Sequence, residues 1–263
     1  MGFAMKLHFE KFGSGYPLVI LHGLFGSGQN WRSVAKSEAL KDFTVYALDL
    51  RNHGLSPHAV LCSLSEMAAD VIDTLEELKE KQFLLLGHSL GGKVAMQIAF
   101  QSPQSLAGLI VVDIAPRSYP PGHLGILDAL QRLNLVGVTN RGELDSQLAH
   151  AIKEPSLRHF LLKNIARTDN GTFEWTIGLE HIANAYPEMI DFHAPKTTSN
   201  VSALFVRGAN SNYILDSDFE LIRSFFGEAE FVDIPDAGHW VHAEQPQAFL
   251  DKIGEFAHAT CLP

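Results

Sequence analysis

The segment 83–92, FLLLGHSLGG, constrains the fold of this chain more than any other stretch. The apolar residues 83–86 predict a short buried strand, and the apolar periodicity of 93–101 predicts a helix directly after it. Gly87 and Gly91 stand two residues either side of Ser89, where side chains would clash at a tight corner between a strand and a helix. The pattern G-x-S-x-G between a strand and a helix predicts a nucleophile elbow, which lifts the Ser89 hydroxyl above the edge of a sheet.

The length and composition favour a globular protein whose partners are small molecules. The chain has 263 residues, of which 46% are hydrophobic and 19% charged, enough for one large α/β domain or a core that carries an insertion. The net charge of −10, without a run of Lys or Arg, predicts no nucleic-acid or membrane partner. It indicates no particular oligomeric state.

Three features of the sequence favour a cytoplasmic protein. Cys62 and Cys261 match neither a disulfide framework nor a zinc spacing, which favours a reducing compartment. No apolar run approaches the roughly 18 residues of a membrane span. The first residues lack the apolar region and cleavage site of a secretory signal.

Predicted strands alternate with predicted helices along most of the chain. Strands are expected at 6–10, 18–21, 44–48, 83–86, 109–112, 201–206 and 230–234. Helices are expected near 31–35, after a capping box formed by Ser63 and Glu66, and at 93–101, 215–226 and 245–258. This alternation predicts an α/β fold with a mostly parallel sheet flanked by helices, whose ligands bind beyond the carboxyl ends of the strands.

The rhythm changes between the predicted strands at 109–112 and 201–206. Helical periodicities occur at 123–135, 143–152, 155–167 and 175–191, and no convincing buried strand is present. We therefore expect a helical cap at 114–200, inserted into a core made of 1–113 and 201–263.

A serine hydroxyl needs a base within hydrogen-bond reach, and histidine suits this task at neutral pH. Among 13 histidines, His239 stands on a turn directly after the predicted last strand, which favours it as the general base. His242 is the nearest rival, but it falls at the start of a helix. As a metal site the pair lacks a third ligand, so we expect neither a metal nor a cofactor.

Two backbone N–H groups are expected to stabilise the charged oxygen of the reaction intermediate. Leu90 supplies one, because it follows the nucleophile at the start of a helix. The loop 22–25 supplies the other, with Leu24 favoured and Phe25 as second choice.

The acid that orients His239 is the open question. Asp113 combines a negative charge with a position at the end of a predicted strand, and we favour it for that reason. Ser211, after the next strand, is the alternative, although a neutral hydroxyl stabilises an imidazolium less than a carboxylate does. Asp216 and Asp218 are further alternatives.

Taken together, several motifs resemble those of the YbfF-type esterases, a subgroup of the α/β-hydrolase fold. They are HGLFGS at 22–27, DLRNHGLS at 49–56, GHSLGGKVAM at 87–96, VVDIAP at 111–116, GANSNY at 208–213 and AGHWVHAE at 237–244. The resemblance implies an esterase or thioesterase of short to medium acyl chains, with acyl-CoA among the candidates, acting through Ser89 and His239. It also implies that a serine at the position of Ser211 completes the triad, with Asp113 close by.

The sequence thus predicts a serine hydrolase that forms an acyl-enzyme on Ser89 with His239 as general base. A C–C bond hydrolase on the same scaffold and a non-catalytic ligand-binding relative remain as alternatives. We expect Asp49, Arg51 and His53 to tie the strand-end loops together and His88 to pack beside the elbow. The aromatic side chains of Trp31, Tyr119, Phe173 and Trp175 are candidates for the lining of an acyl pocket.

Overall fold

The computed structural model describes residues 5–193 and 197–262. Its main sheet has seven strands in the order β1-β3-β2-β4-β5-β8-β9. β1 pairs antiparallel with β3, and the other neighbours are parallel, as the alternation of elements predicts. The strands are β1 (Phe9–Gly13), β2 (Tyr16–Leu21), β3 (Phe43–Leu48), β4 (Phe83–His88), β5 (Leu106–Val112), β8 (Ala203–Gly208) and β9 (Glu230–Ile234).

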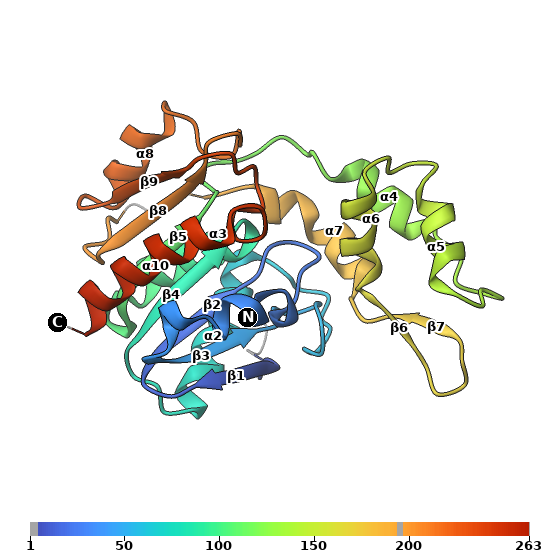
Figure 1. Cartoon of the computed structure of the whole chain (residues 1–263), viewed down its shortest axis with the longest axis horizontal. Coiled ribbons are helices and arrows are strands. Elements are labelled where there is room, and N and C mark those ends of the chain that lie inside the picture. The colour runs from blue at the N-terminus through green and yellow to red at the C-terminus, as the bar shows by residue number, and fades with distance from the viewer. Residues whose placement is uncertain (1–4, 194–196, 263) are drawn as a thin grey trace.

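Helices cover both faces of this sheet (Figure 1). Alternate residues of β4 belong to two separate apolar clusters, because successive strand side chains point to opposite faces. One cluster includes residues of α2 (Leu64–Glu77), α3 (Leu90–Gln101) and α8 (Asp218–Phe225). The other includes residues of α1 (Arg32–Ala35) and α10 (Pro246–Cys261). The predicted α/β fold with a sheet between helical layers is therefore confirmed.

Short elements complete the core. They are the 3-10 helices η1 (Gly28–Trp31), η2 (Glu38–Leu40) and η3 (Pro103–Ser105), and the one-turn helix α9 (Val241–Glu244). The predicted capping box is present at the start of α2, where the Ser63 side chain accepts from the Glu66 N–H and the Glu66 carboxylate accepts from the Ser63 N–H.

The segment between β5 and β8 projects to one side of the sheet, in green and yellow in Figure 1. It contains α4 (Leu124–Gln131), α5 (Arg141–Leu148), α6 (Pro155–Leu162) and α7 (Leu179–Ile190). It also contains a hairpin of β6 (Ile165–Arg167) and β7 (Phe173–Trp175), two partly buried strands that the expectation of helices alone did not include. Strands of three residues are too short to show a period. The expected helix at 155–167 includes β6, and the expected helix at 175–191 includes only the last residue of β7. Residues 194–196 of the predicted cap lie outside the described residues.

The start of the sheet also differs from the expectation. β1 begins at Phe9 instead of residue 6, and β2 begins at Tyr16 instead of residue 18. Pro17 has no N–H to donate to a neighbouring strand. It is tolerated in β2 because it pairs on one side only, with Thr44 of β3, and pairing with β4 starts at Leu18.

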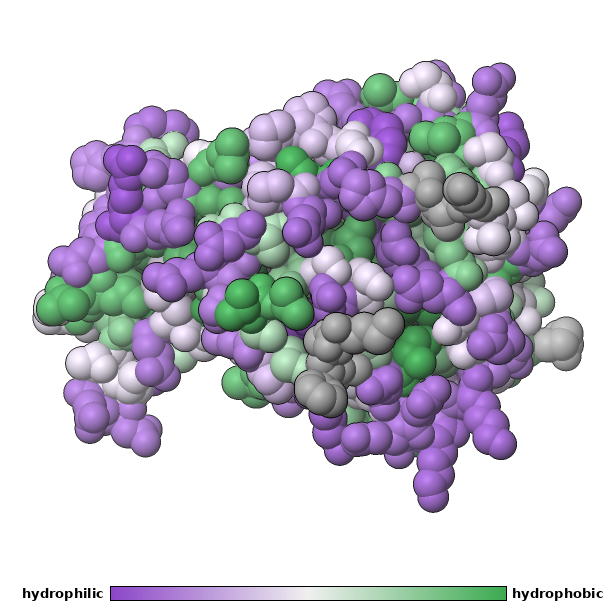
Figure 2. Space-filling view, turned by 180° about the vertical axis from the view of Figure 1, so that it is seen from behind, coloured by the Kyte–Doolittle hydropathy of each residue, from purple (hydrophilic) through white to green (hydrophobic). Residues whose placement is uncertain are grey.

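The rear face of the molecule is mainly hydrophilic, and its hydrophobic residues lie in separate small groups (Figure 2). Within the described ranges, none of the helices combines the length and the apolar character that crossing a membrane would take.

Candidate active site

Ser89 occupies a strained corner between β4 and α3. Its backbone has φ 52° and ψ −116°, a region that non-glycine residues seldom adopt. A Cβ on Gly87 would lie 2.2 Å from the carbonyl oxygen of Gly91, and a Cβ on Gly91 would lie 2.3 Å from the carbonyl oxygen of Leu21. Both glycines are therefore required by the close approach of backbone segments, and the corner holds Ser89 at the edge of the sheet.

Asp113, directly after β5, is fully buried and has φ 51°. Its Oδ2 lies 2.8 Å from Nδ1 of His239, which donates to it. The Ser211 hydroxyl donates to the same Oδ2, and the Gly208 N–H donates to Oδ1 at 3.1 Å. The two favoured candidates for the third position thus contact each other, but the contact with His239 is made by the carboxylate.

The other two aspartates considered for this position point elsewhere. Asp216 lies 2.6 Å from a guanidinium nitrogen of Arg207, and Asp218 lies 2.9 Å from one of Arg117. Neither of them bonds to His239 in the described part of the chain.

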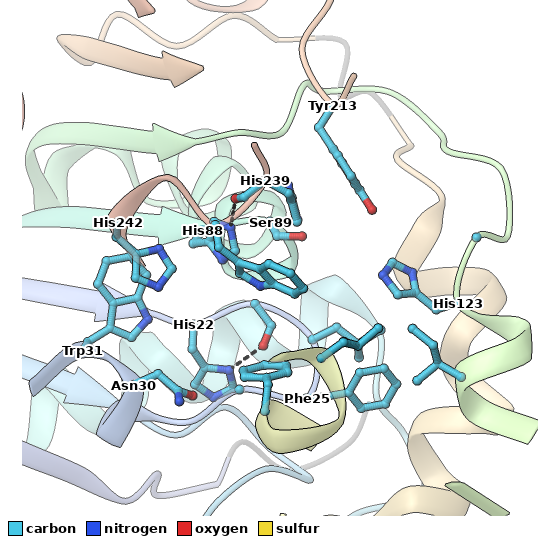
Figure 3. Close-up of a pocket in the computed structure, with 18 residues that line it drawn as sticks. His22, Phe25, Asn30, Trp31, His88, Ser89, His123, Tyr213, His239 and His242 are labelled. Carbon is cyan, nitrogen blue, oxygen red and sulfur yellow. Dashed lines mark hydrogen bonds between the residues drawn. The ribbon is translucent and has the colours of Figure 1, made fainter. Parts of the chain in front are cut away.

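His239 follows β9 and its turn, and with Nδ1 bound to Asp113 its other ring nitrogen, Nε2, remains for Ser89. Ser89 and His239 line the same cavity of about 270 Å³ (Figure 3). Among the described residues, the Ser89 hydroxyl forms no hydrogen bond with the His239 ring. Bonds of this kind commonly tighten only in the complex with substrate.

Two aromatic neighbours fix the His239 segment. The Tyr213 ring stacks on the His239 ring with centroids 3.8 Å apart. His88 lies beside the elbow, as expected, and its Nε2–H donates to the backbone carbonyl of His239 at 2.9 Å. Burial lowers the pKa of His88 well below its usual value, with nearby His239 adding to the effect, so His88 acts as a neutral donor.

His242, the rival base, is held away from this role. Its ring stacks on Trp31 with centroids 4.1 Å apart, and burial lowers its pKa to about 4. Its Nδ1 is buried without a hydrogen-bond partner among the described residues. The carboxylate of Asp113 bonds to His239 and not to His242.

The loop after β2 orients the backbone N–H of Leu24. It does so by holding the Gly23 carbonyl, which belongs to the same peptide group. The Gly23 carbonyl accepts from Nδ1–H of His22 at 2.8 Å and from the Gly26 N–H at 2.9 Å. Because a trans peptide is planar, the N–H of Leu24 points opposite to this carbonyl. Nε2 of His22 accepts from the Leu50 N–H at 3.0 Å, which places the proton on Nδ1.

The neighbouring Phe25 N–H is already used. It donates to Nε2 of His53 at 3.2 Å, and burial lowers the pKa of His53 to about 3, so that this ring stays neutral and can accept. Of the two candidate donors of this loop, Phe25 is therefore already bonded to a side chain. Leu90 is the first residue of α3, and its N–H lies at the free start of that helix.

Asn164, which sequence reasoning missed, bonds to this loop from the segment between β5 and β8. Its Nδ2 donates to the Phe25 carbonyl at 2.9 Å and to the Leu161 carbonyl at 3.1 Å, and the side chain is buried. A lone asparagine after a predicted helix carries no signal for such a contact, because its partner is 139 residues away.

The strand-end loops are tied together largely as predicted. Asp49 accepts from the N–H groups of Gly28 at 2.6 Å and Leu55 at 2.9 Å. Arg51 forms a buried salt bridge with Asp70 at 2.5 Å. No group of three or more metal-binding side chains occurs within the described ranges.

Of the four aromatic pocket candidates, Trp31 lines the cavity of Ser89 and His239. Tyr119 lines a second cavity beside Ser89. Phe173 and Trp175 lie in β7 and line neither of the two.

Comparisons with known proteins place these features in context. Residues 18–252 match the model described as the alpha/beta hydrolase family. The chain is 39% identical to the sn-1-specific diacylglycerol lipase ABHD11 of Xenopus tropicalis, over 93% of this chain and 79% of that protein. It is 31% identical to the esterase YbfF of Escherichia coli, over 91% of this chain and 92% of that protein. A solved structure titled marine microorganism esterase is 41% identical, with a TM-score of 0.93, and covers 96% of this chain and 100% of that one.

Proposed function

This chain belongs to the alpha/beta hydrolase family and is a hydrolase, and we propose that it cleaves carboxylic esters in two steps on Ser89. The observation that carries the proposal is the placement of Ser89, His239 and Asp113. A serine at a strained elbow and a histidine bound to a buried carboxylate line one cavity.

In the first step Nε2 of His239 takes the hydroxyl proton of Ser89 while Oγ bonds to the acyl carbon. The bond from that carbon to the leaving oxygen or sulfur then breaks, and the proton passes from His239 to the leaving group. In the second step water gives a proton to His239 and attacks the acyl carbon. The carbon–Oγ bond breaks, the proton returns to Ser89, and the acid leaves.

The backbone N–H groups of Leu24 and Leu90 stabilise the negative oxygen in both steps. Their value lies in being fixed before reaction, since an N–H that needs no reorientation stabilises developing charge at little cost. The bonds of His22 and Gly26 to the Gly23 carbonyl support this role for Leu24.

We assign the acid to Asp113, with Ser211 as its supporting partner. A carboxylate holds His239 in the tautomer with its proton on Nδ1 and stabilises the imidazolium that forms in each step. The Ser211 hydroxyl donates to Asp113 and so helps to orient that carboxylate. It does not replace the charge.

The proposed substrate is a small ester or acyl thioester with a short to medium acyl chain. Similarity to a diacylglycerol lipase and to the YbfF esterase supports ester chemistry. The segment 114–200 would act as a cap over the site, because His123, Ile126, Leu157 and Phe160 line the cavity of Ser89 and His239.

The test is a series of p-nitrophenyl esters from acetate to octanoate, with matched thioesters, assayed with the wild type and Ser89→Ala. We expect turnover that Ser89→Ala abolishes, while Ser224→Ala, at an exposed position of α8, retains it. Absence of Ser89-dependent turnover on every ester would reject the proposal. A C–C bond hydrolase would instead cleave β-diketones in preference to the esters.

A further inference from the structure

Two cavities meet at Ser89. One has a volume of about 270 Å³ and the other about 250 Å³. Five residues line both and form the boundary between them: Leu24, Ser89, Gly122, His123 and Tyr213. In Figure 3, Tyr213 and His123 lie on one side of Ser89, while Trp31 and His242 lie on the other. The nucleophile therefore faces two adjoining spaces.

The two spaces differ in which catalytic group they contain. His239 lines the larger one, which we call the His239 cavity. Leu90 lines the smaller one, which we call the Leu90 cavity. His239 does not line the Leu90 cavity, and Leu90 does not line the His239 cavity.

This difference indicates which cavity takes the acyl chain of an ester and which takes its leaving group. The leaving oxygen must receive a proton from His239, so the leaving group has to lie in the His239 cavity. The acyl carbon stays bonded to Ser89 with its oxygen on the N–H groups of Leu24 and Leu90. Resting on the function proposed above, we propose that the acyl chain occupies the Leu90 cavity and the alcohol or thiol occupies the His239 cavity.

The Leu90 cavity is suited to an uncharged hydrocarbon chain. Ile114, Met189 and Ile190 are among its lining residues. Among the described residues, Lys93 is its one charged lining residue. It is buried and has three carbonyl partners at the end of α7: Met189 at 3.3 Å, Ile190 at 2.6 Å and Asp191 at 3.2 Å.

An ammonium group has three N–H donors, and these three carbonyl oxygens take all of them. Among the described residues, these contacts therefore leave no donor of Lys93 for a carboxylate at the far end of an acyl chain. We therefore expect the cavity to accept a butyryl ester and to reject the corresponding hemisuccinate, which carries a charge at that end.

The His239 cavity offers an apolar wall made by Ile126, Leu157, Phe160 and Trp240. It has polar side chains in Asn30 and several histidines, and no Lys or Arg is among its lining residues in the described part of the chain. These walls suit a neutral, bulky alcohol.

Matched substitutions test the two cavities separately. Met189→Trp narrows the Leu90 cavity, and Ile126→Trp narrows the His239 cavity. For Met189→Trp the ratio of kcat/KM for p-nitrophenyl octanoate to that for the acetate should fall by about 10-fold or more. For Ile126→Trp that ratio should stay within about twofold of the wild type, and the preference for bulky over small alcohols in a series of butyrate esters should fall by about 10-fold. The opposite pattern would overturn the assignment.

A structure of the wild type settles the assignment even where a tryptophan variant fails to fold. A p-nitrophenyl methyl alkylphosphonate forms a bond from Ser89 Oγ to phosphorus and releases p-nitrophenolate, while the Ser89 proton passes to His239. The alkyl chain, bonded directly to phosphorus, then stands in the acyl position. We expect that chain in the Leu90 cavity, and its presence in the His239 cavity would refute the proposal. Failure to modify Ser89 at all would instead count against the proposed serine mechanism.

Discussion

Oδ2 of Asp113 accepts hydrogen bonds from both Nδ1 of His239, at 2.8 Å, and the hydroxyl of Ser211. The carboxylate is fully buried, so its charge acts on His239 with little screening by water. The hydroxyl of Ser211 reaches the base only through this carboxylate. Asp113 therefore acts on His239 directly, and Ser211 acts on it through Asp113.

We expect Asp113→Asn to lower kcat by about 10⁴-fold, because the amide favours the wrong tautomer of the base. Ser211→Ala should lower kcat by about 10-fold, since Asp113 loses one of several donors. Steady-state kinetics on one p-nitrophenyl ester compares the two. A larger loss for Ser211→Ala would show that the hydroxyl is the true partner of His239.

Gly23→Ala should displace the loop that carries the Leu24 N–H. An added Cβ would lie 2.9 Å from Nδ1 of His88 and 3.3 Å from the Ser89 Cβ. Loss of one donor to the negative oxygen corresponds to a fall in kcat of about 10²–10³. Gly125→Ala is the control, because its Cβ meets no heavy atom within 4 Å and it lies within α4. Equal kcat values for the two variants would contradict the role of this loop.

Asn164→Leu removes the donor that holds the Phe25 carbonyl and leaves the peptide between Phe25 and Gly26, in the loop that carries the Leu24 N–H, less fixed. We expect kcat to fall by about 10-fold, in line with one hydrogen bond, and KM to change by less than about twofold. Affinity for a boronic acid, which mimics the tetrahedral intermediate, should fall together with kcat.

Asn184→Leu changes an exposed amide on α7 and serves as the control for Asn164→Leu. A rise in KM with unchanged kcat in Asn164→Leu would show that Asn164 shapes the substrate cavity and not the oxyanion loop.

Stability should decrease as the pH falls below about 6.5, in part because of His53. Burial lowers its pKa to about 3 in the folded protein, while the unfolded chain binds a proton near 6.5. Between these values the unfolded state holds more protons, so the free energy of unfolding falls on acidification, by up to about 1.4 kcal/mol per pH unit from this group.

Urea unfolding at several pH values between 5.5 and 7.5 measures this dependence. His53→Asn should show a shallower pH dependence than the wild type, whereas parallel curves would rule out the contribution of His53.

Much of the fold follows from local patterns. The strand before Ser89 is continuously apolar because both its faces are buried, and the capping box at Ser63 and Glu66 marks the start of α2. The placement of Asp113 and His239 follows from the rule that parallel strands end at one edge of the sheet. These regularities made the sheet and its edge predictable.

The parts that escaped prediction depend on contacts between distant residues. The hairpin of β6 and β7 has strands of three residues, too short to show a period. Asn164 bonds to Phe25, 139 positions away, and the sequence around either residue does not predict this hydrogen bond. The sequence does not distinguish Ser211 as an alternative to Asp113 from Ser211 as its donor, and in the folded chain it is the donor.

The bond between Lys93 and the end of α7 limits how this protein can be redesigned. Lys93 is four positions after Ser89, on the elbow helix α3, yet its hydrogen bonds in the described part of the chain go to carbonyl oxygens of the segment between β5 and β8. A chimera that exchanges this segment for another would leave a buried ammonium without partners next to the reactive serine. Such an exchange requires either a helix that ends at the same place or an apolar residue at position 93.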